Sequence, residues 1–216
     1  MPSAVIFDLD GVVVDSESAW DAARRELVAR VGGAWKPEAT RAMLGMSSGE
    51  WSRYVRDELG VPLDLDGINT AVVDNIERRY REALPLIPGA VDAVRRMAGR
   101  WPLGLASSSN RPIIDLVLEQ AGLTASFVAT VSSEEVGRGK PAPDVYLEAV
   151  RRLEVEPRGC VAIEDSSNGL RSAAAAGMTV IAIPNREFAP DPDALALAAT
   201  VLDSIGELTV ELVSEL

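Results

Sequence analysis

Residues 5–11 read Val-Ile-Phe-Asp-Leu-Asp-Gly, a short apolar run that ends in two carboxylates and a glycine. A continuous apolar run of this kind predicts a strand that is buried on both faces of a parallel sheet. Asp8 and Asp10 then follow the carboxyl end of that strand, where open α/β sheets place their ligands. Because adjacent carboxylates repel each other unless a cation or a proton separates them, the stretch also suggests a divalent metal site.

The composition is that of a globular chain. Its 216 residues suit one domain with a sizeable core, or one core with a small insertion. The apolar runs are too short to cross a bilayer and the N-terminus shows no secretory leader, so we expect neither a membrane span nor secretion. Cys160 is the only cysteine, which excludes an internal disulfide and favours the cytoplasm. We expect Cys160 to be a small buried apolar residue rather than a nucleophile.

The charge balance narrows the possible partners. A formal net charge of −12, from 33 acidic and 21 basic residues, should repel nucleic acid and anionic membranes. We therefore expect a small-molecule partner, and a chain that is a monomer or a weak homo-oligomer. The absence of histidine excludes His-based triads and His-ligated zinc, so acid–base chemistry must come from Asp, Glu, Lys or Tyr.

Between residues 15 and 83 the sequence predicts a small bundle of helices. Apolar side chains recur there at helical spacing, and no strand-like run interrupts them. Asp15 or Ser16 could cap the first helix, and Gly32 and Gly33 would end it. The apolar sets are Trp20, Ala23, Leu27, Val28 and Val31; Trp51, Tyr54, Val55 and Leu59; and Ile68, Val72, Ile76 and Tyr80.

From Gly89 onward, helical patterns alternate with short apolar runs. Such alternation predicts an α/β fold with a doubly wound parallel sheet. The core would comprise residues 1–14 and 84–216, interrupted by the helical segment, and residues 191–199 would form a loop with a weak helical turn. The further predicted strands are residues 103–106, 127–131, 161–163 and 179–183.

Polar side chains follow four of the predicted strands along the chain. Parallel strands end at one edge of the sheet, so the topology should gather these side chains. Each cluster alone would also suit a turn or a helix start, but their coincidence at one edge favours a functional site. The clusters are Asp8 with Asp10, Ser107, Lys140, and Glu164 with Asp165.

This set of residues fits phosphoryl transfer. Three carboxylates can hold Mg²⁺, which prefers oxygen ligands. Lys140 can screen a nucleophilic carboxylate from the phosphate that it attacks, and Ser107 can donate a hydrogen bond to a phosphate oxygen. A second carboxylic acid two residues after the nucleophile can protonate the leaving oxygen and then deprotonate water.

The ordered set resembles the four motifs of the haloacid dehalogenase superfamily, and the resemblance extends over nearly the whole chain. It is nearest to the β-phosphoglucomutase-like sugar phosphatases, which implies a Rossmann-like α/β core with an inserted all-α cap at residues 15–83. The motifs are Asp-Leu-Asp-Gly-Val-Val-Val-Asp-Ser at 8–16, Ser107, Gly-Lys-Pro-Ala-Pro-Asp at 139–144 and Ile-Glu-Asp-Ser at 163–166.

The resemblance also implies a role for each motif residue. Asp8 would be the nucleophile that becomes aspartyl phosphate, and Asp10 would be the general acid and base. Ser107 and Lys140 would hold the phosphoryl group. Mg²⁺ would be bound by Asp8, by the backbone carbonyl of Asp10 and by Asp165, with Glu164 in or beside the coordination shell.

In this family the cap selects the substrate, here expected to be a small sugar or polyol phosphate. Residues 44–48 look like the cap loop that faces the site, although an ordinary helix–helix loop would have the same composition. Trp20 lies near the expected hinge, although its helical spacing equally suits the cap core. The candidate substrate contacts are Trp20, Gly45, Ser47, Ser48, Ser108 and Asn110.

The main alternative is a β-phosphoglucomutase, which would return the phosphoryl group to the sugar. That branch is expected to have a hinge histidine and a cap-loop arginine, where this chain has Trp20 and Ser48. Arg53, just beyond the loop, could replace that arginine as a clamp for a second phosphate. A true dehalogenase would not need the proton donor Asp10, and a receiver-type signalling module would lack the helical insertion.

Overall fold

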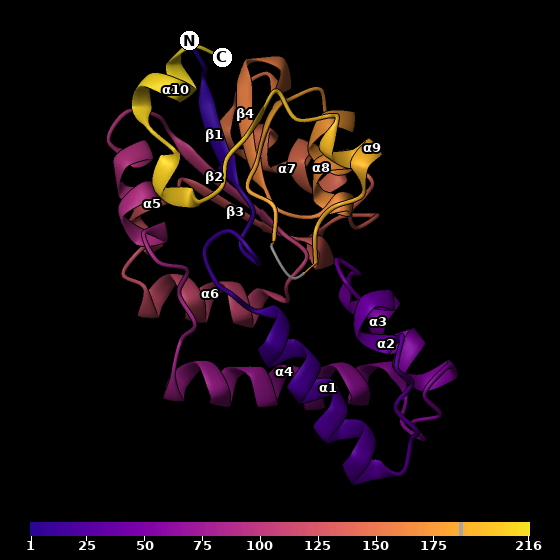
Figure 1. Ribbon diagram of the computed structural model, residues 1–216. Helices are drawn as coiled ribbons and strands as arrows, with labels where there is room; N and C mark the ends of the chain where they lie inside the picture. The colour runs from indigo at the N-terminus through magenta and orange to yellow at the C-terminus, as the bar shows by residue number, and fades with distance from the viewer. Residues whose placement is uncertain (186–187) are drawn as a thin grey trace.

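The computed structural model describes residues 1–185 and 188–216 and contains a six-stranded parallel sheet with helices around it (Figure 1). The strand order is β3-β2-β1-β4-β5-β6, and every neighbouring pair is parallel. The predicted doubly wound sheet is therefore confirmed. The strands are β1 Ala4–Phe7, β2 Leu103–Ser107, β3 Ala129–Ser132, β4 Cys160–Glu164, β5 Thr179–Ala182 and β6 Thr200–Val201.

Strand β1 is the centre of the core because both of its faces are covered. Val5 and Phe7 pack into one apolar cluster with α5 and α6, and Ala4 and Ile6 pack into a second cluster with α7 and α8. This alternation of neighbouring side chains is the period of a strand. The core helices are α5 Ala90–Ala98, α6 Arg111–Gln120, α7 Asp144–Leu153, α8 Ser167–Ala175, α9 Pro192–Leu195 and α10 Val210–Ser214.

Two details of the core differ from the expectation. The strand predicted at residues 127–131 begins only at Ala129, because Phe127 follows a short 3-10 helix, η1 Thr124–Ser126. Strand β6 was not predicted, since its two residues carry too little pattern to recognise. The weak helical turn expected at 191–199 is present as α9.

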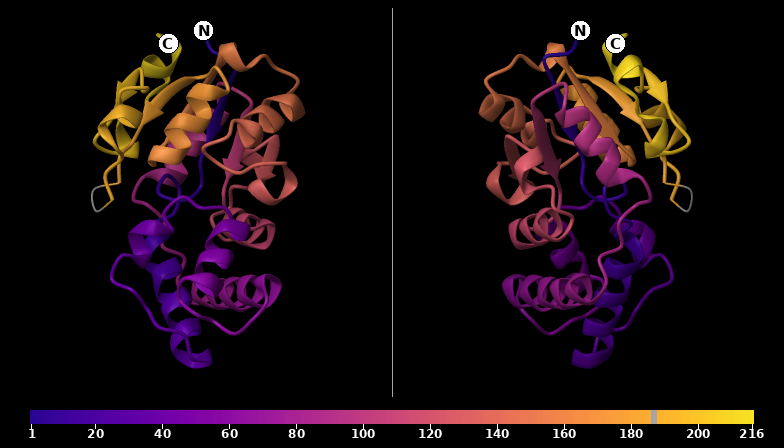
Figure 2. Two further views of the ribbon diagram at one scale, coloured as in Figure 1. Left: turned by 90° about the vertical axis from the view of Figure 1, so that its right-hand side faces the viewer. Right: turned by 90° about the vertical axis from the view of Figure 1, so that its left-hand side faces the viewer.

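Four of the five helices between β1 and β2, the cap helices, lie at one end of the sheet in space, opposite the two termini (Figure 2). Gly32 ends α1 in the left-handed region at φ 100°, as expected. Ser16 is the N-cap residue of α1, which is one of the two positions expected, but its side chain accepts no capping hydrogen bond. The cap helices are α1 Glu17–Val31, α2 Ala39–Ala42, α3 Ser48–Asp57 and α4 Leu65–Glu82.

The two connections between the core and the cap helices run side by side. Asp15 N–H donates to the Pro85 carbonyl at 2.8 Å, and Ile87 N–H donates to the Val13 carbonyl at 3.0 Å. Two adjacent crossings of this kind suit a hinge, and we retain 14/15 and 83/84 as the proposed boundaries. Within the described residues, no helix combines the length and the apolar character that a bilayer crossing requires.

Candidate active site

Strand register brings the predicted site residues to one edge of the sheet. Phe7 is level with Leu105 of β2 and Ile163 of β4, so Asp8 emerges between the ends of both neighbouring strands. Asp8 N–H also continues the ladder by donating to the Ile163 carbonyl at 3.0 Å. Ser107 and Glu164 are the last residues of β2 and β4. The cap helices lie beyond this edge (Figure 1).

Lys140 is the electrostatic centre of the cluster. Its Nζ donates to Asp8 Oδ1 at 2.8 Å and to Glu164 Oε1 at 2.6 Å, and all three side chains are buried. Burial alone would lower the pKa of Lys140, but the two carboxylates outweigh burial and raise it above its ordinary value. Lys140 is therefore a fixed positive charge beside the predicted nucleophile.

Glu164 is held by donors on both of its oxygens. Oε1 accepts from Lys140 and from the Tyr146 hydroxyl at 2.8 Å. Oε2 accepts from the backbone N–H of Asp165 at 3.0 Å and of Ser166 at 3.3 Å. A carboxylate with this many donors is well suited to positioning Lys140 and less available as a direct metal ligand.

The acidic residues Asp8, Glu164 and Asp165 form a group that fits a cation. Each offers a carboxylate oxygen, and these atoms lie within 4.8 Å of one another. Burial, opposed by Lys140, raises the pKa of Asp8 to about 8, and burial with Glu164 raises the pKa of Asp165 well above its usual range. The Asp165 carboxylate makes no hydrogen bond to another described side chain. Such crowding of acids is relieved by a bound divalent cation.

Gly11 leaves room for the Asp165 carboxylate. Its φ is +76°, and a Cβ built on it would lie 1.9 Å from Asp165 Oδ2. A side chain at position 11 would therefore be strained and would also displace this acid. Gly11, the last residue of the stretch at 5–11, is therefore required at this position on steric grounds.

Asp10 lies on the other side of the cluster, against the end of β2. The Ser109 hydroxyl donates to Asp10 Oδ2 at 2.7 Å, and the Ser107 hydroxyl lies 3.3 Å from the same oxygen. Ser107 Oγ in turn accepts from the Ser109 N–H at 2.9 Å. Asp10 is thereby oriented by neutral hydroxyls, whereas Asp8 contacts a lysine.

A cavity of about 570 Å³ opens above these groups and has walls from both the core and the cap helices. Asp8, Asp10, Lys140 and Asp165 line its core side. Its described wall is completed by Glu17, Arg41, Leu44, Gly45, Ser108, Ser166, Ser167, Asn168, Arg171, Asn185, Phe188, Ala189 and Asp191.

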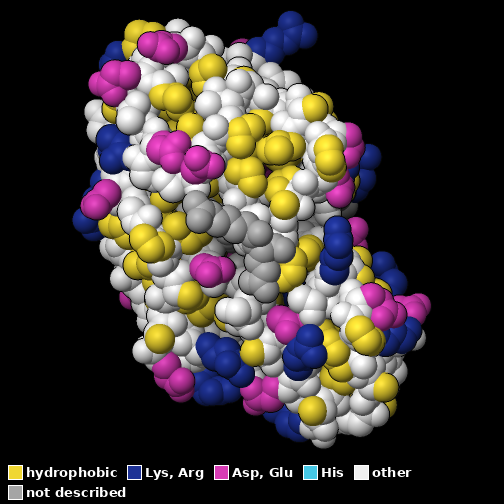
Figure 3. Space-filling model, viewed as in Figure 1, with side chains coloured by type: hydrophobic (Ala, Val, Ile, Leu, Met, Phe, Trp, Pro, Cys, Tyr) yellow, Lys and Arg dark blue, Asp and Glu magenta, His cyan; other side chains and the backbone are white. Residues whose placement is uncertain are grey.

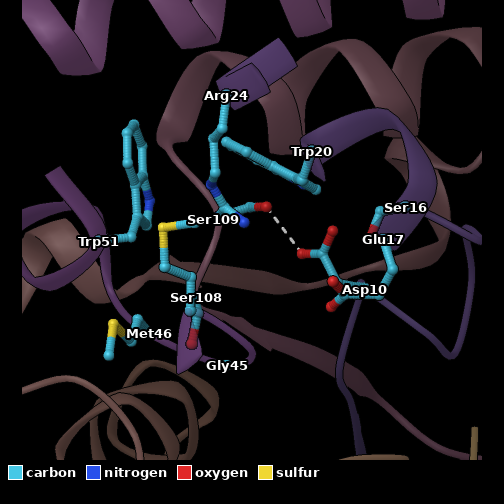
Figure 4. Close-up of a pocket in the computed structure, with 11 residues that line it drawn as sticks. Asp10, Ser16, Glu17, Trp20, Arg24, Gly45, Met46, Trp51, Ser108 and Ser109 are labelled. Atoms are coloured by element: carbon cyan, nitrogen blue, oxygen red, sulfur yellow. Dashed lines mark hydrogen bonds between the residues drawn. The ribbon is translucent and has the colours of Figure 1, made fainter. Parts of the chain in front are cut away.

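A second, smaller cavity of about 50 Å³ lies between the cap helices and the core residues Asp10, Ser108 and Ser109 (Figure 4). It shares Asp10, Glu17, Gly45 and Ser108 with the larger cavity, so the two meet beside the predicted acid–base residue. Its other described lining residues are Ser16, Trp20, Arg24, Met43, Met46, Trp51 and Ser109.

The candidate substrate contacts separate into two groups. Trp20, Gly45 and Ser108 line one or both cavities. Ser47, Ser48 and Asn110 are absent from the described lining of both and make other contacts. Ser47 caps α3 with Glu50 and packs against Gly139, where an added Cβ would lie 2.9 Å from the Ser47 Cβ. Ser48 is buried in the first turn of α3.

Asn110 joins the cap helices to the core. Its Nδ2 donates to Asn69 Oδ1 of α4 at 3.1 Å and to Glu134 Oε1 of η2 (Ser133–Glu135) at 2.6 Å. This placement favours a role in holding the cap in position. Arg53, the other residue named for the cap, is exposed and is not part of the described lining of either cavity.

Several residues at the site were not singled out from the sequence. Tyr146 lies in the first turn of α7, a helix that the sequence indicates only by its apolar face. Glu17 and Arg24 occupy the same face of α1 as Trp20, at spacings of three and four residues. That spacing is the available signal, but the apolar residues dominate the helical pattern of this face.

The fold and the motif residues define a class of protein. A family model for haloacid dehalogenase-like hydrolases matches residues 2–177 of the chain. The chain belongs to the haloacid dehalogenase-like hydrolases, and the resemblance seen in its motifs is confirmed.

Individual relatives refine this assignment. Hexitol phosphatase B from Escherichia coli is 35% identical over 214 residues, which cover 96% of this chain and 95% of that protein. Among solved structures, β-phosphoglucomutase from Clostridium difficile matches with a TM-score of 0.85 at 25% identity, covering 100% of this chain and 96% of that one. CbbY from Rhodobacter sphaeroides, in complex with phosphate, matches with a TM-score of 0.85 at 30% identity, covering 96% of each chain.

Proposed function

We propose that the protein is a Mg²⁺-dependent phosphatase that hydrolyses a sugar or polyol phosphate through an aspartyl phosphate on Asp8. The observation that carries this proposal is the buried contact of Lys140 with both Asp8 and Glu164, beside the Asp165 carboxylate and beneath the large cavity. A nucleophile, a fixed cation and a second acid in one cavity are the parts that phosphoryl transfer requires.

The residues divide the reaction into two steps. One Asp8 oxygen attacks phosphorus while the other accepts from Lys140, and Asp10 gives its proton to the leaving oxygen as the ester bond breaks. Asp10 then takes a proton from water, whose oxygen attacks the phosphorus and releases inorganic phosphate from Asp8. Ser107 and Lys140 donate to the phosphoryl oxygens. Mg²⁺, held by Asp8, Asp165 and the Asp10 carbonyl, would supply charge neutralisation between the nucleophile and the phosphate.

The substrate class rests on the relatives and on the cavity. Hexitol phosphatase B and a fructose-1-phosphate phosphatase from Escherichia coli, 28% identical over 83% of this chain, are named for sugar or polyol phosphates. A cavity of about 570 Å³ suits a small metabolite. Acidic and basic side chains lie interspersed on the face shown in Figure 3, which gives a polyanion no broad basic surface there. A cytoplasmic location is part of the proposal, in keeping with the lone, buried Cys160.

The test is phosphate release from a panel of sugar and polyol phosphates by the purified protein with Mg²⁺. We expect turnover of at least one hexitol or hexose phosphate and loss of turnover with a chelator. Ca²⁺ should not replace Mg²⁺, because it takes more ligands at longer distances and would misplace Asp8. Equal rates with Ca²⁺, or with excess chelator, would contradict the metal assignment.

A phosphoglucomutase is the second candidate, and one observation favours it. The cap loop carries no cation, but Arg41 of α2 lines the large cavity. An arginine there could hold the second phosphate of a bisphosphate intermediate. The deciding assay supplies β-glucose 1-phosphate with a trace of glucose 1,6-bisphosphate. Inorganic phosphate should appear first; glucose 6-phosphate appearing well ahead of it would replace the phosphatase by the mutase.

A further inference from the structure

Arg24 is a buried guanidinium that makes no hydrogen bond to any other residue described in the structure. Its relative exposure is 6%, and its Nε is fully enclosed with no acceptor. Among the described residues no carboxylate lies within ion-pair distance of it. Its guanidinium carbon lies 5.2 Å from the centre of the Trp20 ring and 5.1 Å from that of Trp51. Aromatic contacts offset part of the cost of burying this charge, but they provide no acceptor for its Nε–H.

The donors are directed at the small cavity. Figure 4 shows the Arg24 side chain running from α1 past Trp20 toward the part of the cavity where Ser109 and Asp10 lie. This cavity opens into the large one at Asp10, the residue that would protonate the leaving oxygen. A group bound beside Arg24 would therefore belong to the alcohol part of a phosphate ester.

The size and charge of the small cavity select the chemistry of its occupant. About 50 Å³ accommodates a few water-sized groups, which suits one or two hydroxyl-bearing carbons. Glu17 and Asp10 line the same space as Arg24, so an anionic substituent would meet two carboxylates and one guanidinium. A hydroxyl group can accept from Arg24 and donate to Glu17, and it brings no charge of its own.

We propose that Arg24 and Glu17 form a subsite that binds hydroxyl groups on the alcohol part of the substrate, next to the ester oxygen. The proposal rests on the phosphatase function proposed above and deepens it. Arg24 is then the residue that selects hydroxyl-rich phosphate esters, and the Trp20 and Trp51 rings hold its guanidinium in place. Binding of the substrate supplies the acceptors that the protein itself does not provide.

The experiment compares two substrates in wild type and in Arg24→Met, which keeps the length of the side chain and removes its donors. A hexitol 6-phosphate carries hydroxyls along its alcohol part, whereas p-nitrophenyl phosphate has none. The ratio of kcat/KM for the hexitol ester over the aryl ester should fall about 10- to 100-fold in the variant, as expected for lost hydrogen bonds from a buried charged donor. Arg30→Met, an exposed arginine in the last turn of the same helix, should keep the wild-type ratio.

Thermal unfolding of the same proteins tests whether Arg24 is only structural. Removing a buried charge that lacks an acceptor should leave the midpoint unchanged or raise it. A lowered midpoint with an unchanged substrate ratio would overturn the proposal, as would an unchanged ratio alone. A larger loss for a bisphosphate than for the hexitol ester would also overturn it, in favour of an anion site. Absence of phosphate release from any ester by the wild type would instead refute the proposed function.

Discussion

The core side and the cap side of the candidate site differ in how their buried cations are paired. On the core side Lys140 contacts Asp8 and Glu164, and Glu164 in turn accepts from Tyr146 and two backbone amides. On the cap side Arg24 is enclosed by aromatic rings and has no hydrogen-bonding acceptor among the described residues. The protein itself pairs Lys140 with two carboxylates, whereas the proposed substrate would supply the acceptors for Arg24.

We infer from this difference that the core side carries out the reaction and that the cap side selects the substrate. A phosphoryl group has the same charge and shape in every monoester, so its donors and its nucleophile can be set in place before binding. The alcohol part varies between esters, and donors that are satisfied only by the correct alcohol discriminate against others. We therefore expect substitutions on the core side to change kcat for all esters, and substitutions on the cap side to change the preference among them.

The largest effect should come from Asp8→Asn. The amide is a poor nucleophile, so turnover should fall at least about 10⁴-fold for every ester, and no phosphoenzyme should form. Phosphate release, together with mass spectrometry of beryllofluoride-treated protein, measures both consequences. Near-normal turnover would rule out covalent catalysis at Asp8, and the core side could then no longer be described as the side that carries out the reaction.

Lys140→Ala should cost more than Ser107→Ala. Lys140 contributes a full charge in a buried site, so we expect a loss of about 10³-fold in kcat/KM, against about 10²-fold for the neutral donor Ser107. Both losses should be similar for hexitol and aryl esters, because the phosphoryl group is the only part of the substrate that the two residues are proposed to contact. Steady-state kinetics on the two esters provides the measurement; the reverse order would mean that the role of Lys140 is misassigned.

The core side could be predicted from sequence because its residues sit at the ends of strands. Once β1, β2 and β4 are recognised as parallel, Asp8, Ser107 and Glu164 must lie at one edge, whatever the helices do. Lys140 needed the motif as well, since it lies in a loop between η2 and α7. The steric reason for Gly11 became visible only when the Asp165 carboxylate was placed against it.

The cap side could not be predicted in the same way. The positions of Glu17 and Arg24 depend on how α1 packs against α4 and meets Trp51 of α3, and helix packing follows from many weak contacts. Gly45 of the loop at 44–48 lines both cavities, whereas Ser47 of the same loop caps α3 through its contacts with Glu50. A pattern along one helix does not say which face meets the substrate.

A smaller effect should follow from breaking the contact between the cap and the core at Asn110. Asn69→Ala removes one hydrogen bond to Asn110, so we expect KM to rise only a few-fold with little change in kcat. Asn110→Ala should behave in the same way if Asn110 acts only by holding the cap. A much larger rise for Asn110→Ala than for Asn69→Ala, measured on the hexitol ester, would show that Asn110 contacts the substrate.

The smallest expected effect concerns the pH dependence of stability on the cap side. Burial, opposed by Arg24, raises the pKa of Glu17 from 4.5 to about 7. Between these values the folded state holds a proton that the unfolded state has lost, so this group makes stability fall as pH rises. Glu17→Gln lacks the titration, and its melting temperature should therefore decline less than that of the wild type between pH 5 and pH 8.

Thermal unfolding of both proteins at several pH values, with a chelator present throughout, isolates Glu17, because the other buried acids are common to both and cancel in the difference. Glu26→Gln is the matched control on the same helix. Hydrogen bonds from Asn75 and Arg79 lower the pKa of Glu26, so it titrates below this range and its variant should parallel the wild type. If the melting temperature of Glu17→Gln also parallels that of the wild type, then water reaches the Glu17 carboxylate in the folded protein. The cap side would then not bury its charged groups without partners, and the contrast with the core side would fail at Glu17.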